Sequence, residues 1–101
     1  LINNAKDIKM YAIITNWEFA SITDEMPKQS ERIFPRLKAQ GALNVYNIQT
    51  SETTGSVVSV WPDKDTADKA MDEVQSVRSE ATSTFDSKVI SVASGPVIVK
   101  A

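Results

Sequence analysis

Two residue types are missing from this 101-residue sequence, which contains no cysteine and no histidine. Without cysteine, disulfide bonds, thiol nucleophiles and cysteine-ligated metal or iron–sulfur sites are excluded. Without histidine, the chain lacks the most frequent general base, the most frequent metal ligand and the usual proximal ligand of haem. We therefore expect a protein that holds neither a metal nor a cofactor.

Long hydrophobic runs and an excess of one charge are missing too. No stretch reaches the roughly 20 apolar residues of a membrane-spanning helix, and residues 1–9 hold no apolar segment typical of a secretory signal. The formal net charge is −2, whereas nucleic-acid binders usually concentrate Lys and Arg. Lys28, Arg32, Arg36 and Lys38 form a basic cluster, which favours a solvated helix face over a phosphate site. We expect a cytoplasmic protein whose partner is neither a membrane nor a nucleic acid.

Hydrophobic periodicity and turn residues predict the element order β-α-β-β-α-β. Strands are expected at residues 10–17, 43–50, 56–61 and from 88 onward, with an interruption at 95–96 and a resumption to 100. Helices are expected from a cap at Thr23 or Asp24 to residue 40, and from a cap at Asp63 or Asp65 to residue 85. Pro35 predicts a kink or a break in the first helix. This order predicts one ferredoxin-like α+β domain over residues 1–101, with a four-stranded antiparallel sheet and both helices on one face.

The predicted strands are apolar on both faces. Adjacent strand residues point to opposite faces, and they are both apolar at Ile13 with Ile14, Val57 with Val58, and Val89 with Ile90. Two helices can cover only one face of the sheet, and soluble monomers seldom expose apolar patches of several hundred Å². We therefore expect a homodimer in which a second copy covers the other face.

These features resemble the dimeric α+β barrel superfamily, and within it the group named for antibiotic-biosynthesis monooxygenases. The resemblance covers residues 10–99 and is carried by the segments 10–17, 41–43, 57–63 and 65–70, which include an aromatic end to the third strand and an acidic, alanine-rich helix. It implies the ferredoxin-like fold and the homodimer. The segment after Gly95-Pro96 also resembles an arm that such dimers pass to the partner.

The resemblance points to Asn16, Trp17 and Trp61 as the best candidate site. Cofactor-free oxygenases of the group use an Asn on the first strand and a Trp at the end of the third. Because these strands are neighbours in the predicted sheet, Asn16 and Trp61 are expected to lie close together. An amide can hydrogen-bond a phenolate or ketone oxygen, and a large ring can wall a dry pocket. The alternative is that Trp61 belongs to the core and that Asn16 bonds to backbone at a strand end.

Four further features each have a functional and a structural interpretation. Tyr46 could offer a hydroxyl to a ligand or lie at an interface, and Arg78 could reach a substrate anion or extend to water. Glu18 could be a general base if it is buried. The acids 63, 65 and 68 depart from the calcium-loop pattern, so helix capping is favoured for them.

The resemblance and the missing histidine together narrow the expected function. Haem-degrading members of the group and cyclases with a histidine base are disfavoured. What remains is a cofactor-independent monooxygenase-like or isomerase-like activity on a small aromatic or polyketide-like compound. The alternative, which stays open, is a non-catalytic homodimer that binds a small molecule or has a structural role.

Overall fold

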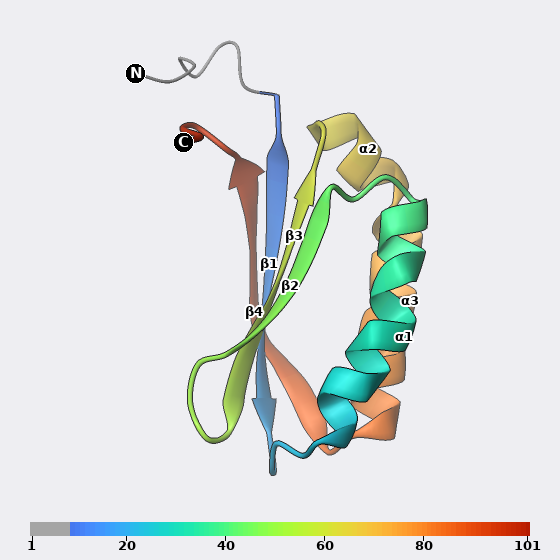
Figure 1. Ribbon diagram of the computed structural model, residues 1–101, viewed down its shortest axis with the longest axis vertical. Helices are drawn as coiled ribbons and strands as arrows, with labels where there is room; N and C mark the ends of the chain where they lie inside the picture. Colours follow the sequence, from blue (N-terminus) through green and yellow to red (C-terminus); the bar gives the residue numbers. More distant parts are fainter. Residues whose placement is uncertain (1–8) are drawn as a thin grey trace.

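The computed structural model describes residues 9–101, which form one sheet and three helices (Figure 1). The strands are β1 (Tyr11–Phe19), β2 (Asn44–Gln49), β3 (Thr54–Trp61) and β4 (Ser87–Pro96). The helices are α1 (Glu25–Ala39), α2 (Lys64–Lys69) and α3 (Met71–Thr84). The predicted absence of a secretory signal concerns residues that lie almost wholly outside the described part of the chain.

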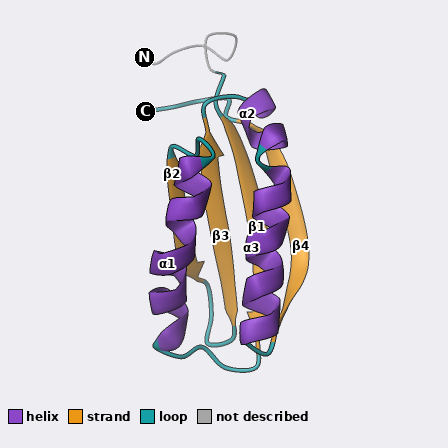
Figure 2. Cartoon of the chain, turned by 90° about the vertical axis from the view of Figure 1, so that its right-hand side faces the viewer, coloured by secondary structure: helices purple, strands orange, loops and turns teal. Residues whose placement is uncertain are grey.

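The sheet is four-stranded and antiparallel, with the order β2-β3-β1-β4. All helices lie on one side of it, and Figure 1 shows the other side bare. Figure 2 shows α1 and α3 side by side over the sheet, with β4 at the uncovered edge. The predicted ferredoxin-like order and the placement of both helical segments on one face are confirmed.

The central strand β1 shows why one face became the core. Along it, Ile13, Thr15 and Trp17 are buried. Of the residues that alternate with them, Ile14 and Glu18 are exposed and Asn16 is half-buried. This alternation follows from the two-residue period of a strand. We call the helix side the covered face and the opposite side the open face.

The core gathers under the helices at the end of the sheet where β3 stops. Trp61 is its largest member and is 0% exposed, and its Nε1 donates a hydrogen bond to Ser59 Oγ at 2.9 Å. The other buried members of this cluster come from β1, α1, α2, α3 and the loop before β2: Ile13, Leu37, Ala42, Ala67, Ala70 and Val74. A buried tryptophan with its N–H satisfied is a packing residue.

The second helical segment differs from its prediction. It is divided at Ala70 into α2 and α3, where one uninterrupted helix was expected. The Ala70 N–H bonds to the carbonyls of both Thr66 and Ala67, which tightens the last turn of α2. The expected cap at Asp63 is confirmed, because its carboxylate accepts from the Thr66 N–H at 2.8 Å.

The first helix also departs from its prediction. The sequence predicts a kink or a break at Pro35, and α1 runs through Pro35 without a break. Pro35 and Glu31 are both exposed, so water can bond to the carbonyl that the proline leaves unpaired. Asp24 stands at the N-cap without a side-chain capping bond, contrary to expectation. At the other end Gly41, with φ of 112°, lies just beyond the helix in a conformation that favours glycine.

The remaining strands follow the sequence pattern with one exception. β2 and β3 form the expected hairpin. β4 runs through Gly95 to Pro96, and the predicted resumption over residues 97–100 is wrong, although the Val97 N–H bonds to the Met10 carbonyl at 2.9 Å. Within residues 9–101 no helix has both the length and the apolar character to cross a membrane.

Candidate functional site

A cavity of about 70 Å³ lies between the covered face of the sheet and the helices α1 and α3. Most of its wall is apolar, and aromatic rings form a large part of it: Trp17, Phe19, Phe34 and Phe85. Trp17 and Phe19 follow each other on the same face of β1, and their rings stack with centroids 6.2 Å apart. Such a wall suits a flat apolar molecule.

Arg78 brings a charge to this apolar wall. Helix α3 carries it beside Val74 and Val77, which turn toward the sheet, and its Nη2 donates to Thr15 Oγ1 at 2.9 Å. Thr15 is itself 4% exposed, so this bond lies inside the protein. The Arg78 Nε atom is buried and has no hydrogen-bond acceptor among the described residues. Burial lowers the pKa of Arg78 from its usual value.

The other polar groups on the cavity wall are largely engaged. Ser59 accepts from Trp61, and Asn47 Nδ2 donates to Ser30 Oγ at 3.0 Å. Gln29, which is also buried, adds a side-chain amide to the wall. Among the described residues that line the cavity, Arg78 is the one ionisable group. The arrangement therefore offers one positive charge and no carboxylate.

A groove between α1 and α3 adjoins the cavity on the outer side. It shares Gln29 and Ile33 with the cavity wall, so the two meet at these residues. Beside it Arg36 of α1 reaches α3, where its Nε bonds Glu73 at 2.5 Å and its Nη1 bonds Glu80 at 2.6 Å. The Glu73 hydrogen bond, ahead of other causes, raises the pKa of Arg36.

The Arg36 contacts change the interpretation of the basic cluster. Arg36 is only half-exposed and is occupied by carboxylates, so it is not part of an open solvated face. Lys28 likewise pairs with Glu25 at 3.3 Å, and Lys38 donates to the Leu43 carbonyl. Through its contacts with Glu73 and Glu80, Arg36 joins the two helices.

The expectation that Asn16 and Trp61 lie close together is wrong. Asn16 is aligned with Ser56, whereas Trp61 is aligned with Tyr11 at the other end of β1. The odd–even offset also puts them on opposite faces of the sheet. Asn16 lies on the open face, where it donates to Ser91 Oγ at 3.0 Å and accepts from Ser56 Oγ at 2.6 Å.

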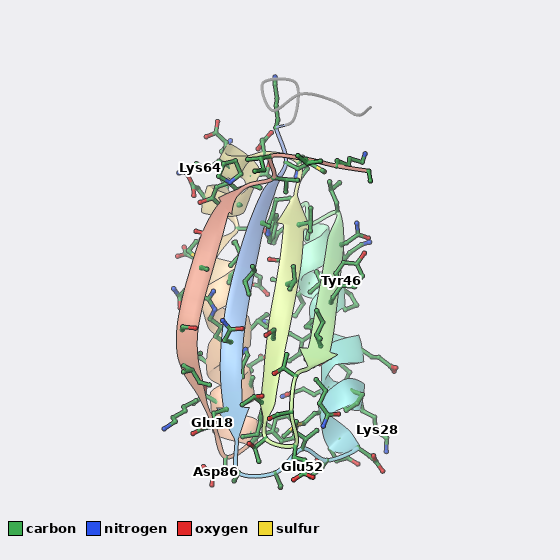
Figure 3. All side chains as sticks on the ribbon, turned by 90° about the vertical axis from the view of Figure 1, so that its left-hand side faces the viewer. Glu18, Lys28, Tyr46, Glu52, Lys64 and Asp86 are labelled. Atoms are coloured by element: carbon green, nitrogen blue, oxygen red, sulfur yellow. The ribbon has the colours of Figure 1, made fainter. Side chains whose placement is uncertain are left out.

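The other predicted residues are spread over both faces. Tyr46 is 52% exposed, and Figure 3 shows it on the open face. Arg78 instead lines the cavity. Glu18 is exposed and pairs with Lys88 at 3.3 Å, so the burial that a general base would need is absent. Within residues 9–101 no group of three acidic side chains could hold a metal ion. A ligand role for Asn16, Trp61 or Tyr46 stays a prediction.

The sequence reasoning missed Thr15 and Gln29. Thr15 has the same parity as Ile13 and Trp17, and a lone hydroxyl between two large apolar residues of one strand face was an available signal. Gln29 precedes Ile33 by four residues, which puts an amide on the buried side of α1. Neither residue type stands out by its chemistry alone.

A scan of the sequence against protein-family models gives no match, and neither does a search of curated protein sequences. Solved structures do match over nearly the whole chain. The NE2512 protein of unknown function from Nitrosomonas europaea has a TM-score of 0.70 and 10% identity, and the match covers 93% of this chain and 94% of that one. A dimeric ferredoxin-like protein from an uncultured marine organism has a TM-score of 0.58 and 16% identity, with coverages of 94% and 91%.

A putative antibiotic biosynthesis monooxygenase from Chloroflexus aurantiacus J-10-fl has a TM-score of 0.56 and 13% identity, and the match covers 92% of this chain and 97% of that one. Identities this low carry information about the fold alone. The structural matches confirm the ferredoxin-like α+β fold. They also bear out the structural resemblance to the antibiotic-biosynthesis-monooxygenase group.

Proposed function

We propose that the protein is a homodimer whose cavity takes up a small aromatic compound and acts on it as a cofactor-independent monooxygenase-like enzyme. The observation that carries the proposal is the cavity itself, with aromatic walls and a single positive charge at Arg78. The class of activity is proposed by analogy with the structural neighbour from Chloroflexus aurantiacus, a putative antibiotic biosynthesis monooxygenase with the same fold.

The chemistry would depend on a substrate that supplies its own reactivity. An electron-rich phenol reacts with dioxygen when the ring C–H para to its hydroxyl is oxidised. Both the ring and the hydroxyl lose hydrogen, one oxygen atom becomes the new quinone carbonyl, and the other leaves as water. The chain would hold the ring between aromatic side chains away from water, with an anionic oxygen near Arg78. An isomerisation through an enolate would use the positive charge of Arg78 in the same way, to stabilise the enolate oxygen.

The homodimer is proposed from the open face of the sheet. Its exposed apolar residues include Ile14, Tyr46 and Ile48, which are 36%, 52% and 46% exposed. Val58 of β3 lies between Ile14 and Tyr46 on the same face, and Val60 follows two residues further along the strand; both are half-buried. A continuous apolar surface of this kind is seldom left to water. The dimeric ferredoxin-like neighbour makes a second copy of this chain the favoured cover.

A second candidate function is binding without catalysis. Arg78 is the one ionisable group among the described residues that line the cavity, and its guanidinium is already protonated, so it cannot accept a proton from a phenol. Proton removal would therefore fall to solvent or to the substrate itself. This observation favours a binding protein if no oxygen is consumed.

The first experiment measures binding through Trp17. In the Trp61→Phe variant Trp17 is the remaining tryptophan of the chain, and it lines the cavity. Addition of phenols or naphthols is expected to shift or quench its emission. The matched Trp17→Phe variant keeps Trp61, which is not part of the cavity wall, and is expected to respond little. A folded protein in which no member of the panel changes the Trp17 emission would contradict both functions.

Dioxygen consumption separates the two candidates. The enzyme hypothesis predicts oxygen uptake with a ligand that binds, and incorporation of one labelled oxygen atom into the product by mass spectrometry. Uptake that requires the folded protein, and that Trp17→Phe or Thr15→Val alters, supports catalysis in this cavity. Tight binding without uptake assigns the chain to the binding class.

A further inference from the structure

Arg78 is a partly buried charge without a counter-ion among the described residues. Salt bridges within residues 9–101 involve Arg36, Lys28, Lys64 and Lys88, and none involves Arg78. Its one side-chain hydrogen bond among the described residues goes to the neutral hydroxyl of Thr15. Buried charges are normally paired, because desolvation without a partner is costly. The position of Arg78 is therefore explained best by an anion that comes from outside the chain.

The free edge of the guanidinium indicates which anion fits. Nε–H and one N–H of Nη2 lie on the same edge of the planar group, where they can bind the two oxygens of a carboxylate side by side. The Nε atom on this edge is the buried donor without an acceptor. Thr15 Oγ1 accepts from Nη2 with its lone pair, so the hydroxyl hydrogen of Thr15 remains available to a ligand oxygen.

The size of the cavity limits the rest of the ligand. Its volume is about 70 Å³, and an engineered apolar cavity that takes up benzene has about 150 Å³. The cavity is thus about half the size of one that takes up benzene, so even a single ring requires the walls to move outward. A fused polycyclic ring system would require α1 and α3 to separate, and Arg36 ties these helices together through Glu73 and Glu80.

We propose that the ligand of this cavity is a single-ring aromatic carboxylate, whose carboxylate binds Arg78 and Thr15 and whose ring packs against Trp17 and Phe19. The proposal rests on the proposed function, since it names the class of molecule that the same cavity takes. It narrows that class in two respects, to an acid and to one ring.

The test is calorimetric titration of the full chain with benzoate, its neutral counterpart benzamide, and naphthoate. Benzoate is expected to bind at least tenfold more tightly than benzamide, and naphthoate to bind more weakly than benzoate. Arg78→Gln is expected to weaken benzoate binding by roughly 10- to 100-fold, the worth of a charge-assisted hydrogen-bonded pair. The same variant is expected to weaken benzamide binding far less, because the neutral amide loses a hydrogen bond but no charge pair. Arg32→Gln removes an equal charge from an exposed position of α1 and is expected to leave benzoate binding as it is.

A thermal melt separates a ligand role of Arg78 from a structural one. If the charge awaits a ligand, Arg78→Met leaves the melting temperature of the free protein unchanged or raises it, because an uncompensated charge is replaced by an apolar chain. Benzoate then raises the melting temperature of the wild type but not of the variant. A marked fall in the melting temperature of free Arg78→Met would overturn the proposal, because it would make Arg78 a structural residue.

The remaining outcomes are distinguishable. If benzamide, phenol or naphthol binds as well as benzoate, the carboxylate proposal fails while the proposed function stands. Tighter binding of naphthoate than of benzoate overturns the one-ring limit. If no aromatic compound binds a folded protein, both the proposal and the proposed function fail.

Discussion

The two faces of the sheet differ in how their apolar residues are used. On β1 the neighbours Ile13 and Ile14 have the same side chain, yet Ile13 is 3% exposed and Ile14 is 36% exposed. The covered face packs under α1, α2 and α3 and encloses the candidate site. The open face carries apolar residues as well, among them Ile14, Tyr46 and Ile48. Figures 1 and 3 show that no helix lies over this face.

The comparison separates the contacts that stabilise the fold of one chain from the contacts that we expect to stabilise a dimer of two chains. Residues of the covered face lose their water through contacts within the chain, so their burial stabilises the fold. Residues of the open face gain less from folding alone, because Ile14, Tyr46 and Ile48 keep 36%, 52% and 46% of their surface exposed in the single chain. Their apolar character is explained by a partner, and for Ile14, Tyr46 and Ile48 a second copy is the proposed one.

The largest difference is expected between alanine substitutions at Ile13 and Ile14. Ile13→Ala should destabilise the folded chain by about 2–5 kcal/mol, because it leaves a cavity in the core. Ile14→Ala should change the stability of the isolated chain by about 0.5 kcal/mol or less. Urea unfolding at a protein concentration below dimer formation measures both. Equal losses for the two variants would contradict the division into two faces.

A charge on the open face should act on assembly rather than on folding. Light scattering is expected to give the wild type twice the 11.1 kDa mass of one chain. Ile14→Asp should weaken the dimer by about 100-fold, because two unpaired carboxylates enter the interface, while circular dichroism stays that of the wild type. The matched substitution Glu18→Gln on the same face should leave the mass unchanged. A wild-type monomer at micromolar concentration would refute the proposed assembly.

A smaller effect is expected where α1 meets α3 on the covered side. Arg36→Gln removes the contacts to Glu73 and Glu80 and should lower the melting temperature by a few degrees at low salt. These side chains are partly exposed, so molar salt should screen the ion pairs and reduce the difference from wild type. Arg32→Gln on the same helix is the control. A loss from Arg36→Gln that is independent of salt would indicate packing by its aliphatic stem instead.

The smallest effect on stability is expected at Asp63, which caps the start of α2 and belongs to neither face of the sheet. Hydrogen bonds from Thr66 lower the pKa of Asp63 below its usual value. A depressed pKa gives a stabilisation that is fully present above the usual carboxyl pKa and is lost as the pH falls through the folded-state pKa. Asp63→Ala should therefore lower the melting temperature slightly at neutral pH. The difference should shrink below about pH 4, and a constant difference over that range would exclude the linkage.

Local patterns made much of the fold readable from the sequence. The strand runs and the cap at Asp63 depend on neighbours within a few residues, and they were predicted correctly. The division of the second helical segment at Ala70 was not, because alanine is a good helix former and gives no local signal of a break. Pro35 gave a local signal of a break, but exposure to water removed its consequence.

The candidate site shows the same limit. The sequence singled out Arg78 for its charge beside apolar neighbours, and the structure places it on the cavity wall. The pairing of Asn16 with Trp61 failed because it depended on register. In the observed register, even-numbered residues of β1 are aligned with even-numbered residues of β3. Asn16 and Trp61 therefore lie on opposite faces of the sheet.

The sequence by itself determined the element order, the two apolar faces and the absence of cysteine and histidine chemistry, since each of these depends on composition or on spacing along the chain. Only the tertiary structure decided that Thr15, Trp17 and Arg78 meet in one cavity while Asn16 and Tyr46 face away from it. The physical reason is that a cavity is made by residues from separate strands and helices. Their meeting is set by strand register and by how far α3 lies from the sheet, and neither quantity is written in any short segment of the chain.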